Sequence, residues 1–243
     1  MRLYCFHHAG AGTTSFAPWP RLLGPSFEVV PVLLPGRDAR IHEPRITELT
    51  DLHREVRNVF DSRPPVPYAL YGHSLGALVA HHVADQWQRF APTPPQLLVV
   101  GASPPPDMRV PVIDDALPSE HQLLRLLGHS GARALPVEVL QTRILPLLRD
   151  DLALARALRL AAERPADVPL LALSGTRDEL AGPDTMAGWS RWTTAAFTQR
   201  TIPGDHYFVR ETALPGLLMD ALAAVTRAPE STTRAVRIAP GTA

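Results

Sequence analysis

The stretch from residue 68 to residue 87, YALYGHSLGALVAHHVADQW, constrains the fold more than any other part of the chain. A short β-type run passes through Gly72 and Gly76 directly into a helical run, and a serine stands midway between these two glycines. A turn this tight lifts the serine hydroxyl above the end of a sheet and leaves no room for side chains two residues before and after it. We therefore predict a nucleophile elbow with Ser74 at its tip.

Strand-like and helix-like patterns alternate along most of the 243 residues. Short apolar runs rich in leucine and valine predict strands at residues 2–6, 27–34, 68–71, 96–101, 169–174 and 199–202. Apolar residues at helical spacing predict helices at 46–60 and directly after the serine. The alternation favours a single α/β domain with a mainly parallel sheet flanked by helices.

The segment 102–168 is too long for an ordinary crossover between two parallel strands. It begins with a proline-rich stretch that forbids a helix, and leucine-rich helical patterns follow. We expect a helical lid insertion at about 104–165 over an apolar chamber, with simple packing onto the domain as the alternative. The residues expected to line the chamber are Leu124, Leu127, Leu140 and Ile144. Residues 228–243 show no apolar period and are expected to form a flexible tail.

The serine of such an elbow needs a base and an acid, and in chains of this fold both follow it in the sequence. Of the ten histidines, His206 alone lies beyond residue 174, in the turn PGDHYF after the last predicted strand, and we predict that it is the base. Asp178 follows the strand at 169–174 and is the predicted acid. The weaker candidates for the acid are Asp184, Asp205 and Glu179.

The loop FHHAGAG after the first predicted strand consists largely of small residues that let the backbone approach a substrate closely. We expect the backbone amides of Ala9 and Leu75 to stabilise a tetrahedral oxyanion. The loop has neither the spacing nor the lysine of a phosphate-binding loop. His7 and His8 lack a third ligand at a suitable spacing, so no metal site is predicted.

Composition excludes several classes of protein. The 24 basic residues, all arginine, balance 24 acidic residues, which argues against a nucleic-acid partner. The single Cys5 excludes an internal disulfide and is typical of a reducing cytoplasm. The chain has no signal-peptide pattern, and no apolar run approaches the roughly 18 residues of a membrane span. We expect a cytoplasmic monomer that binds neither nucleic acid nor membrane.

These motifs together resemble the type II thioesterases that accompany modular polyketide synthases and non-ribosomal peptide synthetases, within the α/β-hydrolase superfamily. The resemblance covers nearly the whole chain, and its motifs are YCFHHAGAG, LLPGRDARIHEPRITELTDL, YGHSLGALVA, EVLQTRILPLLRDDLAL, LSGTRDEL and IPGDHYFV. Within them, PGRDARIHEP is the stretch most specific to this family. The resemblance implies the same triad and the same two oxyanion amides. The chain departs from the family at His7 and Glu179, where proline is common.

The resemblance also implies the substrate, an acyl group carried on the phosphopantetheine arm of an acyl or peptidyl carrier protein. The implied role is editing, the removal of stalled or wrong acyl units, with no cofactor bound by the enzyme itself. Carrier proteins are generally acidic, so Arg37, Arg40 or the arginines of the insertion are candidates for a docking face. The same triad could serve a small-molecule esterase or an acyltransferase. A non-catalytic ligand-binding module of this fold is the alternative from another class.

Overall fold

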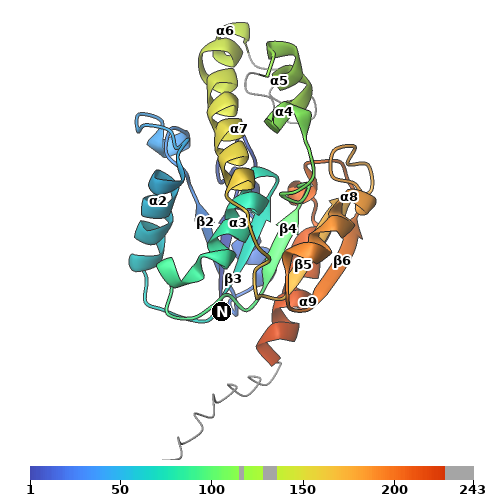
Figure 1. Ribbon diagram of the computed structural model, residues 1–243. Coiled ribbons are helices and arrows are strands. Elements are labelled where there is room, and N and C mark those ends of the chain that lie inside the picture. Colours follow the sequence, from blue (N-terminus) through green and yellow to red (C-terminus); the bar gives the residue numbers. More distant parts are fainter. Residues whose placement is uncertain (115–117, 128–135, 228–243) are drawn as a thin grey trace, which may run out of the picture.

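The computed structural model describes residues 1–114, 118–127 and 136–227, and Figure 1 shows their arrangement. Within these residues the sheet has the strand order β2-β1-β3-β4-β5-β6, and every neighbouring pair is parallel. The strands are β1 (Arg2–Phe6), β2 (Glu28–Val32), β3 (Tyr68–His73), β4 (Leu98–Gly101), β5 (Leu170–Gly175) and β6 (Phe197–Ile202). All six predicted strands are confirmed, and their ends lie within about two residues of the predicted ones. The predicted tail at 228–243 lies outside the described residues.

Helices fill the connections between the strands. The α-helices of the described residues are α1 (Trp19–Leu23), α2 (Leu49–Asp61), α3 (Leu75–Asp85), α4 (Pro111–Asp114), α5 (Glu120–Leu126), α6 (Val137–Val139), α7 (Leu145–Leu160), α8 (Pro183–Ala187) and α9 (Ala213–Arg227). Shorter helical turns are η1 (Thr14–Phe16), η2 (Asp38–Arg40), η3 (Trp87–Arg89), the π-helical η5 (Leu140–Ile144), η6 (Gly188–Trp192) and η7 (Phe208–Arg210). None of the helices in this part of the chain combines the length and the apolar character that a bilayer span requires.

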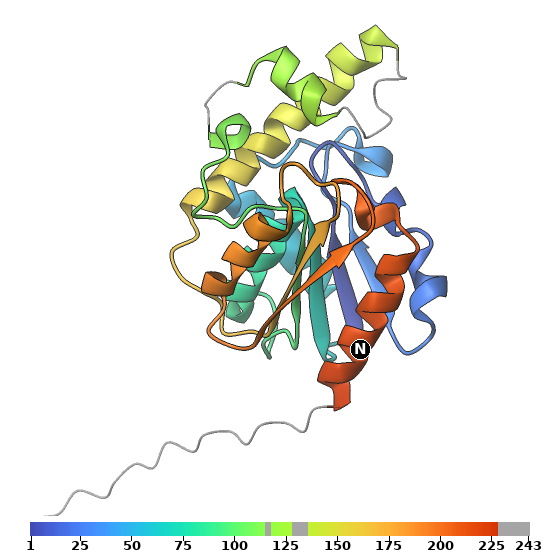
Figure 2. The same ribbon diagram turned by 90° about the vertical axis from the view of Figure 1, so that its right-hand side faces the viewer.

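The sheet is covered on both faces, as Figure 2 shows. Along β1, Tyr4 and Phe6 belong to the core shared with α2, α3 and α8, whereas Leu3 and Cys5 belong to the core shared with α1 and α9. This alternation follows from the pleat, which turns successive side chains to opposite faces. Because both faces are buried, the strands are almost continuously apolar, and this is the signal that made them recognisable in the sequence.

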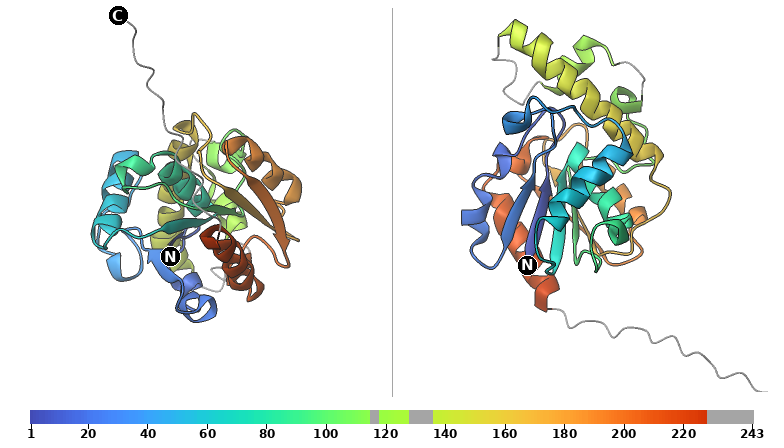
Figure 3. Two further views of the ribbon diagram at one scale, coloured as in Figure 1. Left: turned by 90° about the horizontal axis from the view of Figure 1, so that it is seen from below. Right: turned by 90° about the vertical axis from the view of Figure 1, so that its left-hand side faces the viewer.

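Helices α4 to α7 connect β4 to β5 and lie above the carboxyl end of the sheet (Figures 1 and 2). The lower part of α7 packs against α3, and α4 and α5 pack against α7. A small separate core holds these helices together, and its buried members are Leu123, Leu127, Leu145, Leu148 and Leu152. The N-terminus lies at the opposite end of the sheet (Figures 1 and 3). The insertion therefore stands where the loops that follow β3, β5 and β6 converge.

Candidate active site

The elbow has the geometry that its glycines predict. Ser74 stands between the end of β3 and the start of α3 with φ +55°, a backbone region that residues other than glycine rarely occupy. A Cβ atom at Gly72 would lie 1.9 Å from the carbonyl oxygen of Gly76. A Cβ atom at Gly76 would lie 2.1 Å from the carbonyl oxygen of Phe6 in the neighbouring strand. Larger residues at either position would therefore force the turn open.

The structure brings together the three side chains that were predicted to form a triad. Nε2 of His206 lies 3.2 Å from Oγ of Ser74. Nδ1 of the same ring lies 3.0 Å and 3.1 Å from the two carboxylate oxygens of Asp178. Ser74 follows β3, Asp178 follows β5 and His206 follows β6, so all three lie at the carboxyl end of the parallel sheet. The arrangement can pass a proton from the serine hydroxyl to the imidazole.

The carboxylate of Asp178 is buried and is also held by the backbone. Its Oδ1 accepts the amides of Leu180 and Ala181, each over 3.0 Å. Burial alone would raise the pKa of Asp178, but the hydrogen bonds from His206 and from the two amides outweigh it and hold the pKa below its ordinary value. Asp178 is thus ionised at neutral pH and fixes the orientation of the imidazole.

Within the described residues, none of the other acid candidates is hydrogen-bonded to the histidine ring. Oδ1 of Asp205 accepts the amide of Tyr207 over 2.8 Å and closes the turn around the histidine. Asp184 is exposed in the first turn of α8, and Glu179 is exposed beside Asp178. Asp178 is therefore the member of this group that the geometry supports.

Sequence reasoning missed His73, the residue immediately before the serine. Its ring is fully buried, with Nε2 2.7 Å from the carbonyl oxygen of His206 and Nδ1 2.9 Å from the hydroxyl of Tyr71. Burial lowers the pKa of His73 to about 3, so the ring is neutral. The only sign of this role in the sequence was the presence of a histidine inside the elbow motif. Its partner, the carbonyl oxygen of His206, lies 133 positions away, and no local pattern indicated it.

The two predicted oxyanion amides belong to segments that meet at the serine. Leu75 is the first residue of α3, where backbone N–H groups have no partner within the helix. Ala9 follows β1 and lines the same small cavity as Ser74. A helix N-terminus also presents a positive dipole end to developing negative charge. The assignment of the Ala9 and Leu75 amides to an oxyanion hole stays a prediction.

An apolar cavity of about 50 Å³ lies between the serine and the lid. Its roof consists of lid side chains, namely Ile113, Leu126, Leu127, Leu148 and Leu152, and its floor contains Ser74 and His206. Of the four residues predicted to line a chamber, Leu127 does so. Leu124, Leu140 and Ile144 are half-buried and pack against the core of the lid, and they are not among the residues that border this cavity. For these three a chamber-lining role stays a prediction.

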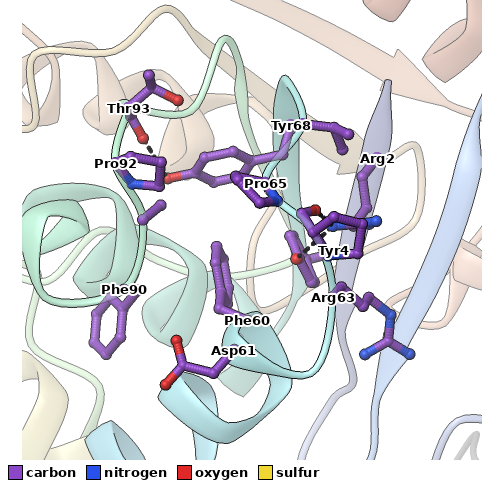
Figure 4. Close-up of a pocket in the computed structure, with 13 residues that line it drawn as sticks. Arg2, Tyr4, Phe60, Asp61, Arg63, Pro65, Tyr68, Phe90, Pro92 and Thr93 are labelled. Atoms are coloured by element: carbon purple, nitrogen blue, oxygen red, sulfur yellow. Dashed lines mark hydrogen bonds between the residues drawn. The ribbon is translucent and has the colours of Figure 1, made fainter.

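A larger hollow of about 310 Å³ lies at the amino-terminal ends of β1 and β3, far from the serine along both strands. Figure 4 shows its aromatic wall, formed by Tyr4, Phe60, Tyr68 and Phe90. The hydroxyl of Tyr68 donates to a backbone carbonyl, and the lining residues include no serine, cysteine or histidine. The hollow therefore contains no nucleophile paired with a histidine base as Ser74 is with His206, and we place the chemistry in the smaller cavity beneath the lid.

The described residues contain no group of three or more histidine, cysteine, aspartate or glutamate side chains that could hold a metal ion. His7, one of the two histidines with a conceivable ligand role, is buried, and its Nδ1 donates to the carbonyl oxygen of His8 over 3.0 Å. Burial and the nearby Arg37 lower the pKa of His7 to about 4, so this ring is neutral. The lack of a cofactor stays a prediction from the sequence.

Comparison with known proteins decides the family. A model of the thioesterase domain matches residues 1–223. The chain belongs to this thioesterase family. It is 33% identical over 219 residues to Thioesterase PikA5 of Streptomyces venezuelae, with 87% of this chain and 76% of the relative covered. It is 28% identical over 214 residues to Gramicidin S biosynthesis protein GrsT of Aneurinibacillus migulanus, with 87% and 84% covered.

A solved structure similar to this chain is also that of a thioesterase. RedJ, a thioesterase from the prodiginine biosynthetic pathway of Streptomyces coelicolor, has a TM-score of 0.79 and 32% identity, with 93% of this chain and 90% of that chain covered. The α/β-hydrolase fold and the thioesterase family expected from the sequence motifs are both confirmed.

The arginines of this thioesterase divide into buried and exposed groups. Arg37, one candidate for a docking face, is buried, and Arg40 is paired with Glu43 and Glu55, so neither is free to dock a partner. The exposed candidates lie in the insertion, where Arg149 and Arg156 stand on the solvent side of α7.

Proposed function

We propose that this thioesterase hydrolyses acyl groups from the phosphopantetheine arm of acyl or peptidyl carrier proteins, as an editing, type II enzyme of polyketide or non-ribosomal peptide biosynthesis. The observation that carries the proposal is the hydrogen-bonded chain Ser74–His206–Asp178 at the floor of an apolar, lid-covered cavity. Two relatives support the pathway, since GrsT is named for gramicidin S biosynthesis and RedJ for a prodiginine pathway.

In the first half of the reaction, Oγ of Ser74 attacks the thioester carbonyl carbon while its proton moves to Nε2 of His206. The carbonyl oxygen becomes an oxyanion, and the amides of Ala9 and Leu75 stabilise it. When the carbon–sulfur bond breaks, the proton on His206 passes to the departing phosphopantetheine sulfur. The products of this half are a free thiol and an acyl ester of the serine.

In the second half, water replaces the thiol. His206 removes a proton from the water as its oxygen attacks the acyl carbon, and the same two amides stabilise the second oxyanion. The bond between the acyl carbon and Oγ then breaks, and Ser74 recovers its proton from the imidazole. Asp178 stays ionised throughout and stabilises the imidazolium that forms in each half.

The charge of the lid helix supports a carrier protein as the partner. Both carboxylates of α7 already have cationic partners, since Asp150 pairs with Arg45 and Asp151 pairs with Arg37. The solvent side of the same helix carries Arg149 and Arg156, and no carboxylate of the described residues pairs with them. A cationic face above the cavity is complementary to an acidic protein that delivers a substrate.

The decisive experiment follows the mass of an acylated carrier protein incubated with the thioesterase, alongside the same acyl group on a small thiol. We expect wild type to remove the acyl mass, faster from the carrier than from the small thiol, and Ser74→Ala to leave it in place while retaining the fold. Hydrolysis of simple esters without any loss of acyl mass from the carrier would keep the triad but reassign the protein to the esterases.

A second pair of variants tests the acid. Asp178→Asn keeps the shape of the side chain but removes its charge, and it is expected to lower kcat by about 10⁴-fold because the imidazole loses its correct tautomer and its counter-charge. Asp205→Asn is the matched control, since an amide oxygen still accepts the Tyr207 amide. Equal losses in both variants would refute the assignment of Asp178.

A further inference from the structure

A buried ion pair lies between the lid helix and the loop that carries Ala9. Asp151, in α7, has 1% of its side chain exposed, and Arg37, after β2, has 2%. Nη2 of the guanidinium donates to Oδ1 of the carboxylate over 2.8 Å, and Nη1 donates to Oδ2 over 2.9 Å. Two parallel charge-assisted hydrogen bonds fix the relative orientation of both side chains.

Both members of the pair also bind the backbone that follows Ala9. Oδ2 of Asp151 accepts the amide of Gly10 over 2.7 Å, and Nη1 of Arg37 donates to the carbonyl oxygen of Ala11 over 3.0 Å. Gly10 has φ +72°, a conformation that glycine adopts without strain. The pair thus binds the backbone N–H of Gly10 and the backbone carbonyl of Ala11. Both residues lie in a short loop that belongs to no helix or strand.

We propose that Asp151 and Arg37 are positioning residues for the oxyanion hole, and that they tie the Ala9 amide to the lid helix α7. The inference rests on the proposed function, in which this amide stabilises the oxyanion. Helix α7 also contributes Leu148 and Leu152 to the cavity. The same helix therefore sets both the wall that meets the acyl chain and the position of an oxyanion donor, and the hole is complete only when α7 lies in place.

The adjacent ion pair provides a matched control. Arg45 donates to Oδ2 of Asp150 over 2.9 Å, and this pair also joins α7 to the segment between β2 and α2. It is much more exposed, at 28% and 38% of the two side chains, and no hydrogen bond joins it to residues 9–11 in the described part of the chain. Variants of the two ion pairs can therefore be compared. Both pairs attach α7 to the domain, but only the pair of Asp151 and Arg37 also binds the loop after Ala9.

The test measures kcat and KM for a small acyl thioester together with the affinity for an alkylboronic acid. A boronic acid forms a tetrahedral adduct with the serine, and its oxygen occupies the oxyanion hole, so its affinity reports on the hole without turnover. We expect Asp151→Asn to lower kcat and boronate affinity by about 10²-fold each while KM changes little. Asp150→Asn is expected to change all three values by no more than about twofold.

Removing one charge of a buried pair leaves the other unpaired and can unfold a protein, so a second variant is needed. The double variant Arg37→Met, Asp151→Leu removes both charges and replaces them with apolar side chains of similar length. Circular dichroism verifies its fold, and we expect it to lose boronate affinity as Asp151→Asn does. A folded double variant that binds the boronate as tightly as wild type would overturn the proposal.

The boronate measurement also separates this inference from the proposed function. If wild type failed to hydrolyse thioesters but the Asp151 and Arg37 variants still lost boronate affinity relative to Asp150→Asn, the positioning role would stand. If wild type hydrolysed thioesters and these variants kept both kcat and boronate affinity, the positioning role would fail and the proposed function would be unaffected.

Discussion

Nε2 of His73 lies 2.7 Å from the backbone carbonyl oxygen of His206, so the residue that precedes the candidate nucleophile holds the backbone of the candidate base. A carbonyl oxygen can only accept a hydrogen bond, so Nε2 carries the proton of this neutral ring. Nδ1 then accepts from the hydroxyl of Tyr71. The elbow and the histidine loop are thereby joined by a hydrogen bond that does not involve the reacting atoms.

Replacing this residue should affect both catalysis and folding. We expect His73→Phe to lower kcat by about 10-fold or more, because the imidazole of His206 loses its fixed position. The free energy of unfolding should fall by about 1–3 kcal/mol, because two buried polar groups lose their partner. Kinetics on a small acyl thioester and urea unfolding measure the two effects.

A double variant distinguishes positioning from simple stability. His73→Phe combined with Tyr71→Phe removes the hydroxyl that the single variant leaves unpaired, so part of the stability should return. The loss in kcat should remain. Recovery of kcat together with stability would indicate that His73 supports only the fold.

The observed lining of the cavity gives a prediction about acyl-chain length. Leu127 faces the cavity, so Leu127→Ala should enlarge it and shift the preference toward longer acyl groups. Leu124 and Leu140 pack against the core of the lid, so their replacement by alanine should leave the preference unchanged and lower stability by about 1–3 kcal/mol. Specificity constants over a series of acyl thioesters and thermal melts provide the comparison. A uniform shift in preference among the three variants would contradict the assignment.

The sequence was sufficient for the parts of this protein that depend on local pattern. The strands were recognisable because a sheet buried on both faces needs apolar runs. Ser74 was recognisable because a strand, two glycines and a helix must follow one another at fixed spacing. His206 and Asp178 followed from chain order and from the rule that the loops after parallel strands meet at one edge. Each of these inferences uses a few adjacent residues and a general rule of topology.

The sequence was insufficient where the answer depends on which distant segments meet. Leu140 and Ile144 belong to a π-helical turn, whose wider spacing breaks the helical period from which a common face was inferred. Arg37 was interpreted as a surface arginine because its partner, Asp151, stands in a helix that passes over it only in the folded chain. A charged residue gives no sign in the sequence of whether its partner is water or a buried carboxylate.

The cationic face of α7 predicts a partner-specific effect on kinetics. Reversing the charge at Arg149 and Arg156 to glutamate should raise KM for an acylated carrier protein by about 10-fold, and the difference from wild type should shrink at high salt. Turnover of the same acyl group on a small thiol should not change, because neither residue lines the cavity. Steady-state kinetics on the two substrates at low and high salt measure the effect.

A control for this prediction lies on the far edge of the sheet. Arg200, in the edge strand β6, is exposed like the two lid arginines, and Arg200→Glu changes the net charge in the same direction. It should leave KM for the carrier unchanged. A similar increase in KM with Arg200→Glu would show that overall charge, not the lid face, governs the encounter.

Buried histidines predict a loss of stability in mild acid. His81 is 3% exposed and lies against Trp189 and Trp192. Burial, opposed only in part by the carboxylate of Asp85, lowers its pKa from 6.5 to about 4. The unfolded chain therefore takes up a proton below about pH 6.5 that the folded chain does not accept until about pH 4. Stability is fully present above this window and falls as the pH drops through it.

The size of this effect can be measured at one position. With one pKa unit worth about 1.4 kcal/mol, His81 should account for a loss of about 2 kcal/mol between pH 7 and pH 5. Urea unfolding of wild type and His81→Gln at both values tests this, since glutamine does not titrate. The variant is expected to lose about 2 kcal/mol less than wild type over that interval. Equal losses would mean that His81 is already protonated in the folded protein, or that water reaches its ring, and burial would then no longer explain an acid-sensitive fold.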